Sequence, residues 1–98
     1  MSTVRVGAEQ ESTAGWRFEV HVRAAEGPGS ESTRHEVILS WVDYEHWSHG
    51  AHAPARVVDA VMRFLLDRVG YGDIAARFDA ARVRRTFPEV DDVLPTML

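Results

Sequence analysis

The sequence of 98 residues contains no cysteine, no lysine and no long uninterrupted apolar run. Without cysteine, the chain cannot form a disulfide framework, a thiolate metal site or a cysteine nucleophile. The first residues, MSTVRVGAEQ, lack the apolar stretch of a signal peptide, and no segment has the length and apolar character of a membrane span. We therefore expect a cytoplasmic protein without membrane association.

The charge of the chain differs between its regions. All eleven basic residues are arginines, and the formal net charge is −4. Residues 1–53 hold four arginines and eight acids, residues 54–87 hold seven arginines and four acids, and three further acids follow Pro88. A net negative charge argues against a general nucleic-acid binder but does not exclude one.

Two segments have the alternation that is typical of strands with one buried face. In residues 16–24, WRFEVHVRA, apolar side chains fall on one side and charged ones on the other. Residues 34–42, RHEVILSWV, alternate in the same way, and residues 26–32 between them have turn composition. The pattern predicts an antiparallel β-hairpin. Residues 1–15 are expected to be a flexible segment, with at most a short edge strand at residues 3–6.

Residues 54–69 predict one long helix. Pro54 suits its first position, and Gly70 suits the residue that ends it. Short helical segments are predicted at residues 43–47, with Asp43 as N-cap, and at residues 73–78 and 79–87. Residues 91–98 are expected to be a tail. The predicted fold class is therefore α+β, with a single domain at residues 16–90: a hairpin packed against one long amphipathic helix, followed by two short C-terminal helices.

The apolar side of helix 54–69 covers about 200°, whereas a helix that lies on one sheet needs only about 100°. Two interpretations of the excess stay open. In the first, the protein is a homodimer whose hairpins join into a larger sheet; in the second, the two ends of one chain cover the helix. The first predicts a non-enzymatic protein-interaction or regulatory module without a cofactor. Its contact surface would include Trp16, Trp41, Tyr44, Trp47, Val58, Met62, Phe64 and Leu66.

Two other functions are kept as alternatives. Four arginines near the C-terminus could bind nucleic acid: Arg77, Arg82, Arg84 and Arg85. The connection between the two short helices predicted there is, however, shorter than a helix-turn-helix motif needs. Three histidines at three-residue intervals in YEHWSHGAHAP could bind a metal, although Gly50 and Pro54 interrupt any helix that would align them: His46, His49 and His52. Of the other two histidines, His21 is expected to pair with a carboxylate across the sheet and His35 to be half exposed.

Three stretches of the chain carry a resemblance: HEVILSWVDYEHW, APARVVDAVMRFLLDR and IAARFDAARVRRTFPEV. Together they resemble a family of small uncharacterised bacterial proteins over roughly residues 33–90, most specifically in the closing RFDAARVRRTFPEV. The segment SHGAHA departs from that family, which has a shorter Gly-rich turn there. The resemblance implies no activity, cofactor or catalytic residue.

Overall fold

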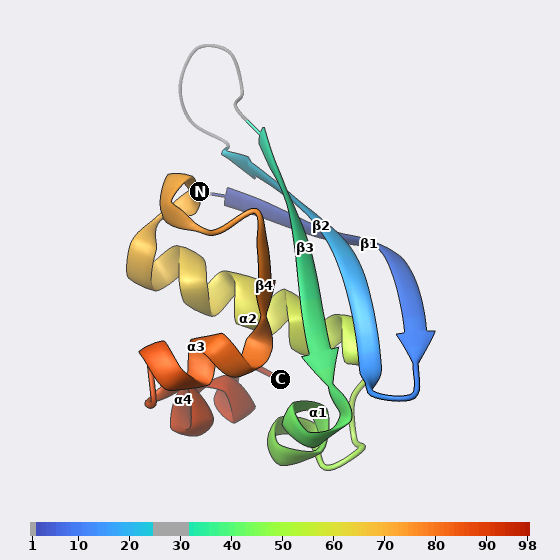
Figure 1. Cartoon of the computed structure of the whole chain (residues 1–98). Coiled ribbons are helices and arrows are strands. Elements are labelled where there is room, and N and C mark those ends of the chain that lie inside the picture. The colour runs from blue at the N-terminus through green and yellow to red at the C-terminus, as the bar shows by residue number, and fades with distance from the viewer. Residues whose placement is uncertain (1, 25–31) are drawn as a thin grey trace.

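A four-stranded mixed sheet forms the main layer of the protein (Figure 1). The computed structural model describes residues 2–24 and 32–98. The sheet has the order β1-β2-β3-β4, in which the first three strands are antiparallel and β4 runs parallel to β3: β1 (Ser2–Ser12), β2 (Gly15–Ala24), β3 (Ser32–Ser40) and β4 (Arg77–Asp79). The predicted hairpin is confirmed as β2 and β3. The turn predicted between them lies almost entirely outside the described residues.

Within the described residues, four helices and one 3-10 turn complete the fold, which confirms the α+β class. They are α1 (Trp41–Ser48), α2 (Pro54–Val69), the 3-10 turn η1 (Tyr71–Asp73), α3 (Ala80–Thr86) and α4 (Val90–Met97). Figure 1 shows α2 crossing one face of the sheet, α1 at the end of β3, and α3 and α4 beside each other. The bounds of α2 are those predicted from Pro54 and Gly70. Among the described residues, no helix is long and apolar enough to cross a membrane.

The core lies between the sheet and α2. Phe18 is opposite Val37 in the strand register, and Trp16 is opposite Leu39, so these apolar side chains share one face. All four are buried, as are the α2 residues that pack against that face, among them Val57, Val61 and Leu65. The opposite face of the sheet carries the charged side chains of the alternating pattern.

The wide apolar side of α2 is covered within the chain. Three of the four α2 residues that were expected at a dimer contact are buried: Val58, Met62 and Phe64. Val4 of β1 and Val90 and Leu94 of α4 belong to the same buried core, and Leu66 is partly buried against it. The second interpretation therefore describes most of the apolar side of this helix, which other parts of the chain cover.

Both chain ends are more ordered in secondary structure than the sequence indicated. Strand β1 has 11 residues rather than four, with an irregularity between Val6 and Glu9 that lets polar residues follow the curving edge of the sheet. Residues expected to form a tail belong to α4, because Val90 and Leu94 bury their side chains completely. Local composition underestimated both elements because a tertiary partner stabilises each of them.

The helix predicted at residues 73–78 is wrong. The chain forms η1 and then β4, whose Phe78 lies in register with Val37 of β3. The Glu36 amide donates a 2.8 Å hydrogen bond to the Ala76 carbonyl. Backbone pairing with the open edge of β3, together with burial of Phe78, outweighs the helical preference of the two alanines. The helix predicted at residues 79–87 is confirmed as α3, with Asp79 as its N-cap.

Candidate functional site

Helix α1 begins where β3 ends, and this sharp change of direction exposes its first residues. Ser40 is the N-cap, and its hydroxyl accepts a 3.1 Å hydrogen bond from the Asp43 amide. The Trp41 amide donates to the carbonyl of Ala14 in the β1–β2 turn. The strand was predicted to run to residue 42 with Asp43 as the cap, so the prediction placed the start of this helix too late. At the other end, His49 closes α1 in the left-handed conformation.

The outer face of α1 carries the exposed apolar surface of the protein. Trp41 is 45% exposed and Val42 is 74% exposed, and they are the exposed large hydrophobic residues among the side chains that the structure describes. Glu45, His46 and His49 join these two around one shallow depression. We call these five residues the α1 patch: Trp41, Val42, Glu45, His46 and His49.

The inner side of Trp41 packs on two other aromatic rings. The ring centroids of Trp41 and Trp16 are 4.3 Å apart, and those of Trp41 and Tyr44 are 6.1 Å apart in an edge-to-face arrangement. Trp16 and Tyr44 are themselves buried. Such contacts fix the plane of an aromatic side chain, so the exposed face of Trp41 is held in one orientation.

An ion network fixes the inner face of α1 to α3 and α4. Arg84 donates from one Nη to Asp43 Oδ1 at 2.8 Å, and from Nε and the other Nη to the two oxygens of Asp91 at 2.9 and 3.1 Å. Trp47 Nε1 donates to Asp91 Oδ1 at 2.9 Å, and His46 Nε2 lies 3.5 Å from Asp91 Oδ2. One carboxylate of α4 therefore receives donors from both α1 and α3.

The ion network stabilises the charged forms of Asp91 and Arg84. Partial burial acts to raise the pKa of Asp91, but the hydrogen bonds from Arg84 and Trp47 outweigh it, and the pKa lies below its ordinary value. Hydrogen bonds to Asp91 and Asp43 likewise raise the pKa of Arg84. Asp43 Oδ2 is buried without a hydrogen-bond partner among the described atoms, so Arg84 is the side chain that neutralises this carboxylate. The network therefore holds α1 in a fixed position against α3 and α4.

The eight residues expected at an interaction surface divide into two groups. Trp41 is the one that is exposed, and Leu66 is partly buried; the other six lie in the core: Trp16, Tyr44, Trp47, Val58, Met62 and Phe64. Val42 and Glu45 of the α1 patch were missed. The signal that could have located them is Ser40 followed by Asp43 three residues later, a pattern typical of a helix start.

The three histidines of the loop have different partners. His46 approaches Asp91, His49 caps α1, and His52 Nδ1 lies 3.4 Å from the Ser48 hydroxyl. In the part of the chain that the structure describes, no group of three or more His, Asp or Glu side chains is arranged to hold a metal ion. The structure therefore does not bring the three together as a ligand set.

The two remaining histidines lie in the sheet. His21 approaches Glu19 of its own strand at 3.3 Å rather than a carboxylate on a neighbouring strand. His35 was expected to be half exposed but is buried, because its ring binds the Ala75 carbonyl through Nδ1 at 2.7 Å and the Thr33 hydroxyl through Nε2 at 2.8 Å. It holds the segment before β4 against β3.

The C-terminal arginines do not form one basic surface. Arg84 is engaged with Asp43 and Asp91, and Arg77 Nε lies 2.6 Å from Glu36 Oε2 on the sheet. Arg82 and Arg85 are exposed on α3. Arg77 lies instead on the open face of the sheet with Arg17 and Arg34, where each arginine is paired with a glutamate.

Comparison with known proteins gives no relative: no family model matches the chain, and neither a curated protein nor a solved structure matches it. The function is therefore argued from the geometry of the chain itself.

Proposed function

We propose that the protein is a non-enzymatic interaction module that forms a homodimer through the α1 patch. The observation that carries the proposal is the exposure of Trp41 and Val42 side by side at the start of a rigidly held helix. Exposed apolar side chains next to polar ones are typical of contact surfaces, and tryptophan is enriched at their energetic centres. We propose that this module acts in the cytoplasm, the location expected from the sequence.

A second copy of the chain is the partner that the α1 patch fits. The patch has its apolar residues at the N-terminal end of α1, Glu45 in the middle, and His46 and His49 toward the C-terminal end. Two α1 helices packed antiparallel about a two-fold axis would place each Trp41 near the other chain's His49. The two Glu45 side chains would meet near the two-fold axis, each with the other chain's His46 one position away. The patch is therefore self-complementary, as a two-fold contact requires.

The dimer should be weak. Helix α1 has eight residues, which corresponds to a length of about 12 Å at 1.5 Å per residue. Two such helices cannot bury the roughly 1,600 Å² of a standard interface, and contacts below about 1,200 Å² are typical of transient association. We therefore expect an association that is populated only at high protein concentration.

Sedimentation velocity over a concentration series tests the proposal. The weight-average sedimentation coefficient of the wild type should rise from the monomer value toward the dimer value between about 10 µM and about 1 mM. Val42→Asp should remain monomeric throughout, because a carboxylate would have to be desolvated at the contact. Val42 is largely exposed at the first turn of α1, where an acid is compatible with the helix.

Arg5→Gln is the matched control, because it lowers the net charge by the same one unit on exposed strand β1. It should associate like the wild type. A wild type that stays monomeric at about 1 mM contradicts self-association. A dimer that persists in Val42→Asp contradicts the assignment of the α1 patch.

Nucleic-acid binding is the second candidate function, and the open face of the sheet favours it. Glu36 bridges Arg17 and Arg77 at 2.8 and 2.6 Å, and Glu19 accepts from Arg34 at 3.1 Å. The contact of each arginine with its glutamate involves Nε, and the arginine side chains are 58–78% exposed. Their terminal nitrogens can therefore meet phosphate oxygens.

Fluorescence anisotropy with a labelled oligonucleotide tests this candidate. Affinity should fall steeply with salt, and Arg17→Gln/Arg77→Gln should reduce the logarithmic salt slope by about 2. The matched control, Arg56→Gln/Arg85→Gln, removes two exposed arginines outside the sheet and should change the slope little. Absence of binding at low salt, or equal effects of the two pairs, would eliminate this candidate.

A further inference from the structure

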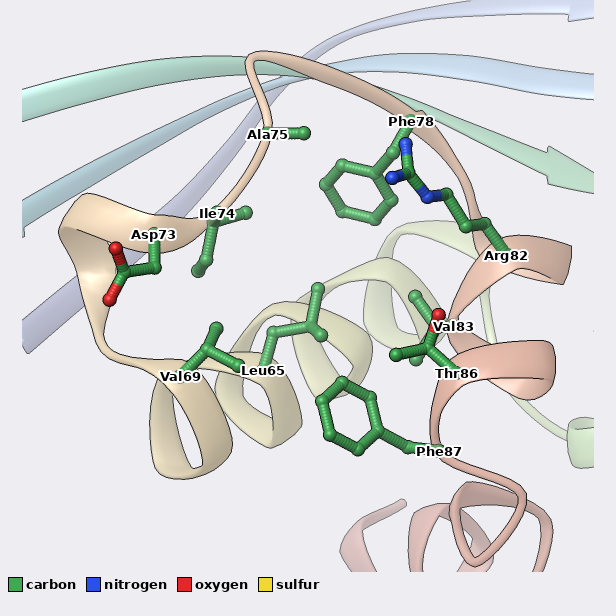
Figure 2. Close-up of a pocket in the computed structure, with 10 residues that line it drawn as sticks. All are labelled: Leu65, Val69, Asp73, Ile74, Ala75, Phe78, Arg82, Val83, Thr86 and Phe87. Carbon is green, nitrogen blue, oxygen red and sulfur yellow. The ribbon is translucent and has the colours of Figure 1, made fainter.

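A second feature of the molecule, independent of the α1 patch, is an apolar hollow between α2 and α3. It has a volume of about 190 Å³ and lies among the last turns of α2, the segment before β4, and α3 (Figure 2). Seven apolar side chains line it: Leu65, Val69, Ile74, Ala75, Phe78, Val83 and Phe87. These residues come from four separate elements, so the hollow is a product of the tertiary fold.

The walls of the hollow are held by contacts outside it. The His35 ring binds the Ala75 carbonyl at 2.7 Å, which keeps the segment before β4 on the sheet and away from α2. On the opposite side, the Phe87 ring packs edge to face on Phe64, with the centroids 5.9 Å apart. Because each wall is anchored separately, the hollow is preformed, as small-molecule sites usually are.

The rim of the hollow carries a cationic side chain. Arg82 lines the hollow and is exposed, and its guanidinium has no ion pair or hydrogen bond with the described residues. Figure 2 shows Arg82 and Phe78 on the side of the hollow opposite Leu65 and Val69. The Thr86 hydroxyl lies at the same rim. Asp73 also lines the hollow, but Figure 2 shows it on the far side from Arg82. The rim at Arg82 and Thr86 is therefore complementary to an apolar group that bears a carboxylate.

We propose that this hollow binds a small monocarboxylate with an aryl or branched aliphatic group, whose carboxylate pairs with Arg82. The size follows from the volume: an apolar cavity of about 150 Å³ is sufficient to bind benzene. The hollow of about 190 Å³ therefore accommodates one aromatic ring or a comparable branched chain, with the carboxylate at the rim. Larger amphiphiles such as long-chain fatty acids exceed this volume.

Titration of the ¹⁵N-labelled full chain with phenylacetate, followed by ¹H–¹⁵N correlation spectra, tests the proposal. A ligand of about ten non-hydrogen atoms should bind with a dissociation constant of about 0.1–3 mM, and the shifted amides should surround the hollow. Phenylacetamide has nearly the same shape without the charge, so it should bind at least about tenfold more weakly. Acetate at the same concentration should cause no comparable shifts, because it lacks the apolar group.

Variants separate the charge from the cavity. Arg82→Gln should weaken phenylacetate binding at least about tenfold, whereas Arg85→Gln, which removes the other exposed arginine of α3, should leave it unchanged. Val69→Phe fills the hollow from its partly exposed side and should abolish binding of both probes while the spectrum stays folded. No saturable shift with phenylacetate, equal binding of the amide, or equal effects of Arg82→Gln and Arg85→Gln would overturn the proposal.

Discussion

Replacement of Arg84 by methionine removes the central side chain of the network that orients α1. The change eliminates three hydrogen bonds, one to Asp43 and two to Asp91. Asp43 is only 4% exposed at its side chain, and its second oxygen has no partner among the described atoms. The variant would therefore bury a carboxylate that nothing neutralises.

The magnitude follows from the burial of each partner. Removal of one member of a buried ion pair costs about 3–5 kcal/mol. Asp91 is 32% exposed and can regain water, whereas Asp43 cannot, so we take the lower end of that range, about 3 kcal/mol. For a domain of this size, the midpoint of thermal unfolding should fall by about 12–24 °C.

Urea unfolding followed by tryptophan fluorescence and by circular dichroism measures this loss. Arg85→Met is the matched control, because Arg85 is the exposed neighbour of Arg84; its free energy of unfolding should change by no more than about 0.5 kcal/mol. The double variant Arg84→Met/Asp43→Asn should be more stable than Arg84→Met alone, since it removes the uncompensated charge. A loss below about 1 kcal/mol for Arg84→Met, or no recovery in the double variant, would refute the reasoning.

Three further predictions concern acid stability, one turn and the C-terminal helix. Because the pKa of Asp91 is lowered on folding, ionised Asp91 stabilises the fold above the ordinary carboxylate pKa of about 3.9, and this stabilisation is lost as the pH falls below that value. Urea unfolding at neutral and acidic pH should show the loss, and Arg84→Met should make the loss smaller. Gly15 has a φ of 149°, and a Cβ there would lie 2.1 Å from a backbone oxygen of β3, so Gly15→Ala should lower the free energy of unfolding by more than about 2 kcal/mol. Gly50 has open space around it, so Gly50→Ala should lower it by about 1 kcal/mol. Equal losses in thermal unfolding would contradict this. Leu94→Ala should cost about 2–5 kcal/mol in chemical unfolding because Leu94 is fully buried, whereas a residue in a loose tail would cost almost nothing.

The parts of the fold that were predicted correctly are those in which local periodicity and burial agree. The hairpin of β2 and β3 alternates with a period of two, and α2 has an apolar side bounded by Pro54 and Gly70. In both cases each residue's preference matches its tertiary environment, so sequence pattern alone was sufficient.

The parts that were missed depend on partners distant in the chain. Strand β4 has three residues and forms because β3 presents a free edge, which no local pattern near Phe78 indicates. The polar strand β1 and the acidic helix α4 likewise owe their structure to the sheet and to α2. Periodicity describes one element at a time and cannot identify which element will cover another.

The candidate site was only partly predictable for the same reason. The sequence identified Trp41 as a contact residue but could not distinguish it from Trp16 and Tyr44, because their exposure depends on where β3 ends and α1 begins. The link from Arg84 to Asp43 spans 41 positions, so it depends on the docking of α3 beside α1. Ser40 and Asp43 together held the one local signal for this geometry.

The most direct test of the central claim is a dilution series of ¹H–¹⁵N correlation spectra of the wild-type chain. Self-association through the α1 patch predicts concentration-dependent shifts of the Trp41 indole and of the amides of Val42, Glu45 and His49. The indole of Trp47, which donates to Asp91 in the interior, should shift much less. Spectra that do not change with concentration, or shifts confined to β1 or α2, would contradict the proposed dimer.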